Sequence, residues 1–350
     1  MPGSAVMRTV VTTVICLFWM VSLAAWSQES APLQNLIRNG QAALDSGDLA
    51  RAATEFEMAR QLAPNDHEVN KGLLLTYLES GHLQQAETIG LAAAARWPQD
   101  YEIAHWLGLV YFKSGKNEQA LVSLERSEKL APGHFDIHFD TALVLLETKQ
   151  YSPAAEELEK ASKLKPSNAL AHVLLGRAYQ NTNRTVEAIE QFKTALKLDP
   201  DVPLGYYHLG FAYASLGRNA EAIAEYQKEL VRSPRNANVR YELGHCLLET
   251  GDWKAAIEHL RIATELAPQN ADAAYDLGKA LLLDGDAPGA ITALRSSIEL
   301  NPSDPSPHFQ LARALEKTGN LDEAKLERQR FAELKKAQPQ TGGMATGRIQ

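Results

Sequence analysis

One pair of histidines with neighbouring aspartates has the spacing of a metal site. His134 and His138 are four residues apart, so both can lie on one face of a helix, and Asp136 and Asp140 are close by. His134, however, precedes the expected start of the helix, and corresponding places elsewhere in the chain hold ordinary residues. We therefore interpret the pair as surface histidines at a helix start and predict no bound metal and no cofactor.

Motifs for enzyme chemistry are missing from the sequence. It contains no HExxH, no GxSxG and no glycine-rich loop ending in GK[ST]. Cys16 and Cys246 are the only cysteines, and Cys246 falls where related segments carry alanine, which predicts a buried, inert thiol. The sequence thus predicts a protein that is not an enzyme.

Composition indicates a folded protein with an acidic balance. Apolar residues make up 45% and charged residues 22% of the 350 residues, and the formal charge is −8. No stripe of lysine and arginine is present, so the sequence predicts no binding of nucleic acid.

The N-terminus has the pattern of an export signal. Arg8 precedes an uncharged run from Thr9 to Ala25, and Ala25 and Ser27 are small residues at the places that a signal peptidase recognises. We predict that residues 1–27 are a signal peptide; the alternative is an uncleaved membrane anchor. Either way, the rest of the protein is expected outside the cytosol, periplasmic or secreted in the first case and membrane-anchored in the second.

Residue types recur along the chain with a period of 34. Alanine and glycine repeat with this step, glycine less strictly, and proline marks it most clearly. The prolines are Pro64, Pro98, Pro132, Pro166, Pro200, Pro234, Pro268 and Pro302. A fixed period of this length is typical of a solenoid or another repeat architecture.

Each period is expected to form two amphipathic helices. In residues 203–236, apolar positions with helical spacing predict a first helix, Gly217 suits the left-handed turn that ends it, and a second apolar face follows. Asn236 can cap the first helix of the next period. A single hairpin cannot bury both of its faces, so neighbouring hairpins must stack.

This pattern resembles the tetratricopeptide repeat family. The resemblance implies an all-α fold, an α-solenoid in which nine 34-residue hairpins form one right-handed superhelix whose first helices line a concave groove. It covers residues 33–338, and residues 339–350 are expected to be a flexible tail. The predicted units are 33–66, 67–100, 101–134, 135–168, 169–202, 203–236, 237–270, 271–304 and 305–338.

In this family, positions 2, 5, 9, 12 and 13 of each unit tend to face the groove. Position 9 is usually polar, yet here positions 9 and 12 of three successive units are apolar, which predicts an exposed patch that contacts a partner. Its members are Leu75, Leu78, Leu109, Phe112, Leu143 and Leu146. Glu68, Glu102 and Asp136 at position 2 would form an acidic edge beside it, although acids in a first turn also favour the helix dipole.

Aromatic residues recur at position 5 and suggest a second contact zone. They include Phe139, Tyr207, Tyr241 and Tyr275. Tyrosine is common there in ordinary family members, so a binding stripe and plain scaffold remain equal alternatives. We therefore predict an exported, non-catalytic adaptor that binds a protein or peptide segment in its groove. The alternative is a membrane-tethered structural or self-associating component of an envelope assembly, which would contact a membrane only if the N-terminal segment is retained.

Overall fold

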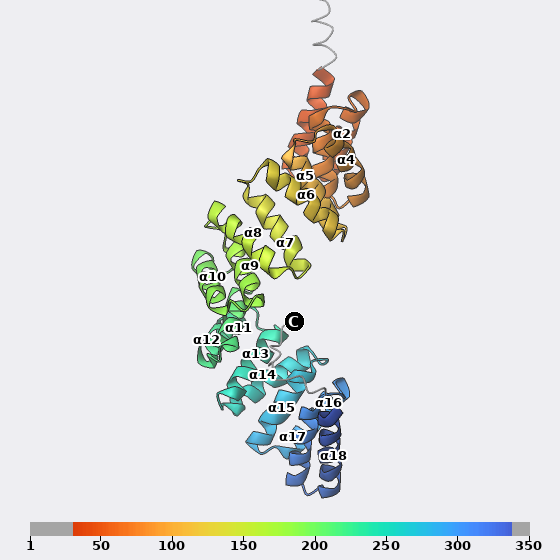
Figure 1. Ribbon diagram of the computed structural model, residues 1–350. Coiled ribbons are helices and arrows are strands. Elements are labelled where there is room, and N and C mark those ends of the chain that lie inside the picture. Colours follow the sequence, from red (N-terminus) through yellow and green to blue (C-terminus); the bar gives the residue numbers. More distant parts are fainter. Residues whose placement is uncertain (1–30, 338–350) are drawn as a thin grey trace, which may run out of the picture. The chain divides into compact units, whose positions relative to one another are not determined.

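The chain is a series of antiparallel helical hairpins. The computed structural model describes residues 31–337, and the predicted signal peptide and the predicted tail at 339–350 lie outside them. A helix over residues 31–45 comes first. It is followed by α2 (Leu49–Leu62), α3 (His67–Glu79), α4 (Leu83–Arg96), α5 (Tyr101–Lys113), α6 (Asn117–Leu130), α7 (Phe135–Glu147), α8 (Tyr151–Leu164), α9 (Ala169–Asn181), α10 (Thr185–Leu198), α11 (Gly205–Ser215), α12 (Asn219–Arg232), α13 (Ala237–Glu249), α14 (Trp253–Leu266), α15 (Ala271–Asp284), α16 (Ala287–Leu300), α17 (Pro305–Lys317) and α18 (Leu321–Ala337) (Figure 1). No strand occurs between residues 31 and 337, so the predicted all-α solenoid of helical hairpins is confirmed.

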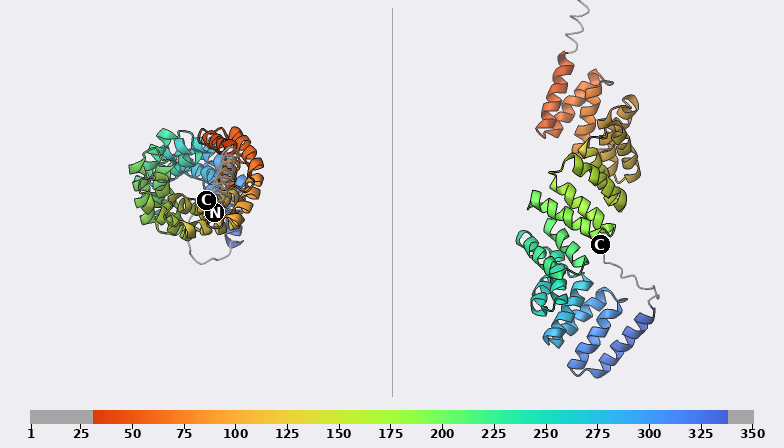
Figure 2. Two further views of the ribbon diagram at one scale, coloured as in Figure 1. Left: turned by 90° about the horizontal axis from the view of Figure 1, so that it is seen from above. Right: turned by 60° about the vertical axis from the view of Figure 1, so that its left-hand side comes forward.

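The chain divides into two compact units between Gln150 and Tyr151. The N-terminal unit contains the helices up to α7, and the C-terminal unit contains α8 to α18. In each unit, every helix packs against the helix before it and the helix after it (Figure 2). Each unit is a stack of helical hairpins, and the predicted bounds of the nine hairpins in one array stay a prediction. The division falls in the turn between α7 and α8.

Turns and caps follow the period of the sequence. The turn after the first helix contains a residue of positive φ in every hairpin, and Gly217 has φ 70°, as predicted. Lys149 and Asn183 take this conformation without being glycine, with φ 58° and 61°. Asn236 accepts hydrogen bonds from the backbone N–H groups of Asn238 and Val239, which confirms its predicted role as a cap.

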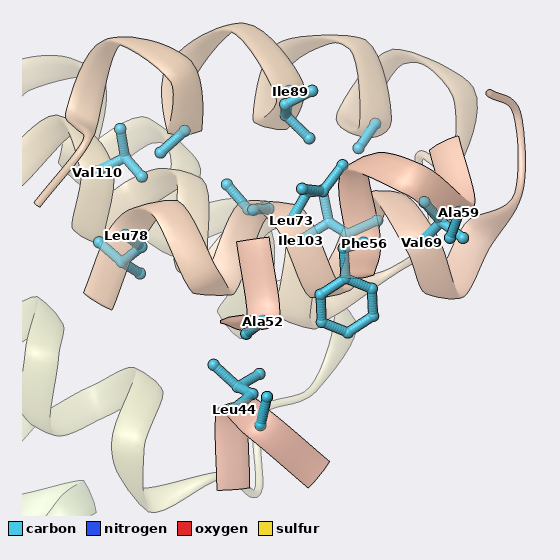
Figure 3. Close-up of a cluster of buried hydrophobic side chains, with 14 residues drawn as sticks. Leu44, Ala52, Phe56, Ala59, Val69, Leu73, Leu78, Ile89, Ile103 and Val110 are labelled. Atoms are coloured by element: carbon cyan, nitrogen blue, oxygen red, sulfur yellow. The ribbon is translucent and has the colours of Figure 1, made fainter. Parts of the chain in front are cut away.

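The core of the N-terminal unit lies between its two layers of helices. Phe56 is 1% exposed, and a Cβ placed on Gly72 would lie 2.4 Å from the Phe56 ring. Gly72 therefore cannot be replaced by a larger residue without a shift of the ring. Figure 3 shows Phe56 within a cluster that also contains Leu73, Ile103 and Val110. Small residues therefore recur where the bulky side chain of a second helix meets the first helices around it.

In four of the hairpins, a polar side chain at position 4 ties the first helix to the preceding loop. His172 Nε2 donates to the carbonyl oxygen of Pro166 at 3.0 Å, and its Nδ1 approaches Gln191 Oε1 at 2.8 Å. Asn70, His138 and Arg240 donate in the same way to the proline six residues before them. These bonds satisfy carbonyl groups that proline-containing loops leave without a helical partner.

We expect His172→Ala to lower the free energy of unfolding by about 1–2 kcal/mol, because the Pro166 carbonyl loses its donor. The measurement is urea unfolding followed by circular dichroism at neutral pH. Leu170→Ala, a change on the same helix at a side chain that is 44% exposed, serves as the control. Equal effects of the two changes would show that the imidazole contributes no more than a surface residue.

Candidate partner-binding groove

The first helices of the N-terminal unit leave an open groove. α3 contacts α5, and α5 contacts α7. A pocket of about 430 Å³ lies along these three helices. Its lining residues are Leu75, Leu78, Glu79, Tyr101, Glu102, His105, Trp106, Leu109, Lys113, His134, Asp136, Ile137 and Asp140.

Leu75, Leu78 and Leu109, which the sequence predicted for this surface, meet at the pocket. Leu75 and Leu109 are half-buried and pack against the core, so part of each side chain faces the groove. Leu78 is only 3% exposed and belongs to the core cluster drawn in Figure 3. The patch is therefore less exposed than predicted, because the hairpin geometry turns position 12 of α3 inward.

The other predicted residues of this unit lie outside the pocket lining. Phe112 is half-buried and packs against the cluster that contains Leu107 and Leu124. Leu143 and Leu146 are half-buried on α7, as is Phe139, whose ring stacks on Phe135 with centroids 5.2 Å apart. The predicted binding role of these side chains stays a prediction.

Trp106 and His105 were not predicted for this site from the sequence. Both line the pocket, from positions 6 and 5 of α5. Trp106 is the one aromatic residue at position 6 in the whole sequence, and this contrast between units was the signal that could have identified it. Its indole adds a broad apolar surface beside Leu109.

Lys71 of the same chain pairs with acidic residues along the predicted acidic edge. Its Nζ donates to Glu102, lies 3.7 Å from an oxygen of Asp100 and stands 5.6 Å from the centre of the Trp106 ring. Burial opposes the charged amine, but the hydrogen bond to Glu102 and the charge of Asp100 outweigh it and raise the pKa of Lys71 above its usual value. Glu102 and Asp100 thus share one cation within the chain.

Two histidines bridge neighbouring first helices. His105 Nε2 donates to Asp140 Oδ2 at 2.7 Å, and His67 Nε2 donates to Asp100 Oδ2 at 2.7 Å. Both pairs join one hairpin to the next. They fix the orientation of two of the acids along this side of the groove.

The histidines of the possible metal pair turn to different partners. His138 Nε2 donates to the carbonyl oxygen of Pro132 at 2.8 Å, whereas the ring of His134 lies 4.5 Å from that of Tyr101. His138 is 2% exposed, so it is a buried structural residue and not the surface residue that the sequence suggested. The four-residue spacing therefore serves packing in this structure.

The tyrosines of the C-terminal unit are largely part of its packing. Tyr241 is 9% exposed, and Tyr207 and Tyr275 are half-buried. Burial, helped by the charge of Glu242, raises the pKa of Tyr207 to about 12. These positions favour the scaffold alternative for Tyr241 and leave part of Tyr207 and Tyr275 at the surface.

Tyr226 carries a buried hydroxyl group without a hydrogen-bond partner in the described part of the chain. The residue is fully buried, and its ring lies 6.1 Å from that of Tyr207. Phenylalanine occupies the equivalent place in other hairpins, at Phe56 and Phe192.

Tyr226→Phe is expected to raise the free energy of unfolding by up to about 1 kcal/mol, since an unsatisfied buried hydroxyl group is removed. Thermal unfolding at neutral pH measures the change. Tyr179→Phe is the matched control: this hydroxyl donates to Glu159 at 2.7 Å, so its loss should destabilise. A destabilised Tyr226→Phe protein would reveal a partner for the hydroxyl group and contradict the prediction.

Cys246 has no reactive character. Its side chain is 1% exposed, and burial raises the pKa of the thiol to about 12. The thiol therefore stays protonated at neutral pH, which agrees with the inert, buried residue predicted from the sequence.

Sequence profiles of known families match much of the chain. Profiles described as tetratricopeptide repeat match residues 37–101, 241–305 and 281–340, and one described as TPR repeat matches residues 182–217. Together they cover more than half of the sequence. The chain belongs to the tetratricopeptide repeat family. A further profile, of anaphase-promoting complex subunit 3, is similar over residues 79–161 of this tetratricopeptide repeat protein.

Solved structures show the same fold. A chain of the APC/C hetero-tetramer Cut9–Hcn1 is similar, with 20% identity and a TM-score of 0.53, over 76% of this chain and 52% of that chain. A tetratricopeptide repeat protein from Parabacteroides merdae is 18% identical with a TM-score of 0.51, and the match covers 71% of this chain and 99% of that chain. MamA from Desulfovibrio magneticus RS-1 is 27% identical with a TM-score of 0.46, and the match covers 49% of this chain and 98% of that chain.

A search of curated proteins found no match to this tetratricopeptide repeat sequence. Among the residues that the structure describes, no helix has the length and apolar character needed to cross a membrane.

Proposed function

We propose that this protein is an exported, non-catalytic adaptor that binds a segment of a partner protein. Tetratricopeptide repeat proteins generally act as scaffolds for protein–protein interaction, and profiles of the repeat together match more than half of this chain. The partner segment would lie across the first helices of the N-terminal unit, in the pocket along α3, α5 and α7. A periplasmic or secreted location is part of the proposal, because residues 1–27 have the pattern of a signal peptide.

The observation that supports binding is an apolar surface that the hairpins leave uncovered. Leu75, Leu109 and Trp106 are each half-buried and line a pocket of about 430 Å³. Covering such side chains with an apolar partner residue removes their exposed area from water, which contributes about 25 cal/mol per Å². Positions along a groove with this character are typical of contact sites.

A non-catalytic role is supported by how the reactive side chains are used. The Cys246 thiol is buried, and His105, His138 and His172 are engaged in hydrogen bonds that join helices and loops. These groups serve the scaffold and lack the geometry of a nucleophile beside a base.

The test is a binding experiment with a Leu75→Asp/Leu109→Asp protein, which is changed at two half-buried leucines of the pocket lining. Pull-down with the 28–350 segment from an extract identifies a partner, and titration then measures its affinity. We expect the double substitution to weaken binding by about 10-fold or more, since a carboxylate in the apolar seat must be desolvated. Circular dichroism confirms that the fold is intact.

Leu91→Asp is the matched control. Leu91 is 50% exposed on α4, in the outer layer of helices, so the same change of chemistry is made away from the groove. Binding that survives the groove substitutions but is lost on Leu91→Asp would move the contact to the outer face and reject the proposed site.

The second candidate, a membrane-tethered structural component, is favoured by one observation, the uncharged run from Thr9 to Ala25. Mass spectrometry of the mature protein separates the two candidates. A chain that begins at Gln28 excludes the tether, and a chain that retains residues 1–27 excludes a freely diffusing adaptor.

A further inference from the structure

An ion pair in the C-terminal unit joins the end of one first helix to the middle of the next. Lys279 Nζ on α15 donates to Glu249 Oε1 on α13 at 3.0 Å, across 30 residues of sequence. Glu249 is the last residue of α13, where the negative end of the helix dipole disfavours a carboxylate. The lysine offsets that repulsion, and its hydrogen bond holds the pKa of Glu249 below the usual value.

The N-terminal unit has the same carboxylate without the lysine. Glu79 is the last residue of α3, and Leu109 takes the place, 30 residues later, that Lys279 takes beside Glu249. No basic residue lies in the last turn of α3, and no ion pair forms at Glu79 within residues 31–337. An exposed carboxylate thus stands at a helix C-terminus, beside the apolar side chain that lines the groove.

The remaining charges of the groove leave Glu79 available. Glu102 is paired with Lys71, and Asp140 is paired with His105. Asp136 is a second exposed acid of the lining without an ion pair in the described chain. It lies in the first turn of α7, where the helix dipole already stabilises its negative charge. Lys113 is the single lysine in the lining and ends α5, where the dipole favours a cation.

We propose that the groove selects a partner segment in which a lysine or arginine stands next to an apolar side chain. The cation would bind Glu79 in the way that Lys279 binds Glu249, and the apolar side chain would lie on Leu109 and Trp106. This inference rests on the proposed function and adds the chemistry of the partner to it. An acidic segment would meet Glu79 and Asp136 and be rejected.

The experiment compares two fluorescein-labelled amphipathic peptides with the full mature protein. They share one pattern of leucines and carry either lysine or glutamate at every charged position. Fluorescence anisotropy is expected to show binding of the lysine peptide about 10-fold or more tighter than that of the glutamate peptide, with the preference reduced by added salt.

Glu79→Gln and Glu249→Gln are matched substitutions at equivalent repeat positions. Glu79→Gln should weaken binding of the lysine peptide by about 3–10-fold, while Glu249→Gln changes it by less than about 2-fold, because its charge is already paired. Lys113→Met should tighten binding, since it removes a like charge.

Equal binding of the two peptides, no binding of the lysine peptide, or equal effects of the two glutamine substitutions would overturn the inference. The proposed function is judged separately by Leu109→Asp. If this protein loses binding of both peptides, the apolar surface at Leu109 is supported as the binding site even where the charge preference is absent. Unchanged binding of both peptides rejects that surface as the site.

Discussion

Phe192→Ala is expected to lower the free energy of unfolding by about 3–5 kcal/mol, because it empties the centre of a hairpin. Phe192 is fully buried on α10. A Cβ on Gly176 of α9 would lie 2.5 Å from its ring, and the His208 ring of α11 is stacked against it with centroids 5.6 Å apart. The ring therefore fills the space between two hairpins, and helices that pack this closely cannot collapse into the cavity that alanine leaves.

Urea unfolding with circular dichroism at neutral pH measures this loss. Val186→Ala, on the same helix with 63% of the side chain exposed, should change stability by less than about 0.5 kcal/mol. Phe192→Leu should fall between the two, since leucine fills the equivalent place at Leu158 and Leu260. If Phe192→Ala and Val186→Ala were equally mild, the stack would be able to close around the missing ring, and the account of its packing would be wrong.

Acidification is expected to destabilise the C-terminal unit through His208. Burial, with a smaller contribution from the charge of Arg177, lowers the pKa of His208 to about 3. An unfolded histidine has a pKa of about 6.5, so the unfolded chain binds the proton more readily. The stability that the neutral ring contributes is complete above pH 6.5 and is lost as the pH falls toward 3. Between pH 6.5 and 4.5 the loss amounts to about 2–3 kcal/mol.

His208→Leu isolates this contribution. Leucine already occupies the equivalent position of the preceding hairpin, at Leu174. The difference in unfolding free energy between the two proteins, measured across the pH range, should shift in favour of His208→Leu as the pH falls. His245 has the opposite sign, because its hydrogen bond to Asp276 raises its pKa, but both proteins carry it and its effect cancels. Parallel pH profiles for the two proteins would refute the assignment to His208.

The fold could be predicted to the level of single turns, because each hairpin repeats one set of local contacts. Gly217 marked a left-handed turn, and every equivalent residue adopts a positive φ, Lys149 included. The division at Gln150 could not be predicted, since Lys149 fits the period as well as any glycine would. A period describes neighbours in sequence and carries no information about where the chain divides into compact units.

The candidate site was only partly predictable. Leu75 and Leu109 were found because apolar residues stood where the family pattern has polar ones, and both line the pocket. Leu78 carried the same signal but is 3% exposed. Whether an apolar side chain faces the groove or the core depends on how far its helix is rotated against the next one, which residue type does not encode.

The sequence alone determined the repeat, the all-α hairpins and the apolar character of the inner positions, because a fixed period and helical spacing impose the same local packing each time. Only the tertiary structure decided which charged side chains already form ion pairs within the chain. Lys71 neutralises Glu102 and His105 holds Asp140, whereas Glu79 has no counterpart to Lys279. Those pairings join residues about 30 positions apart, and their geometry arises only when one hairpin packs on the next.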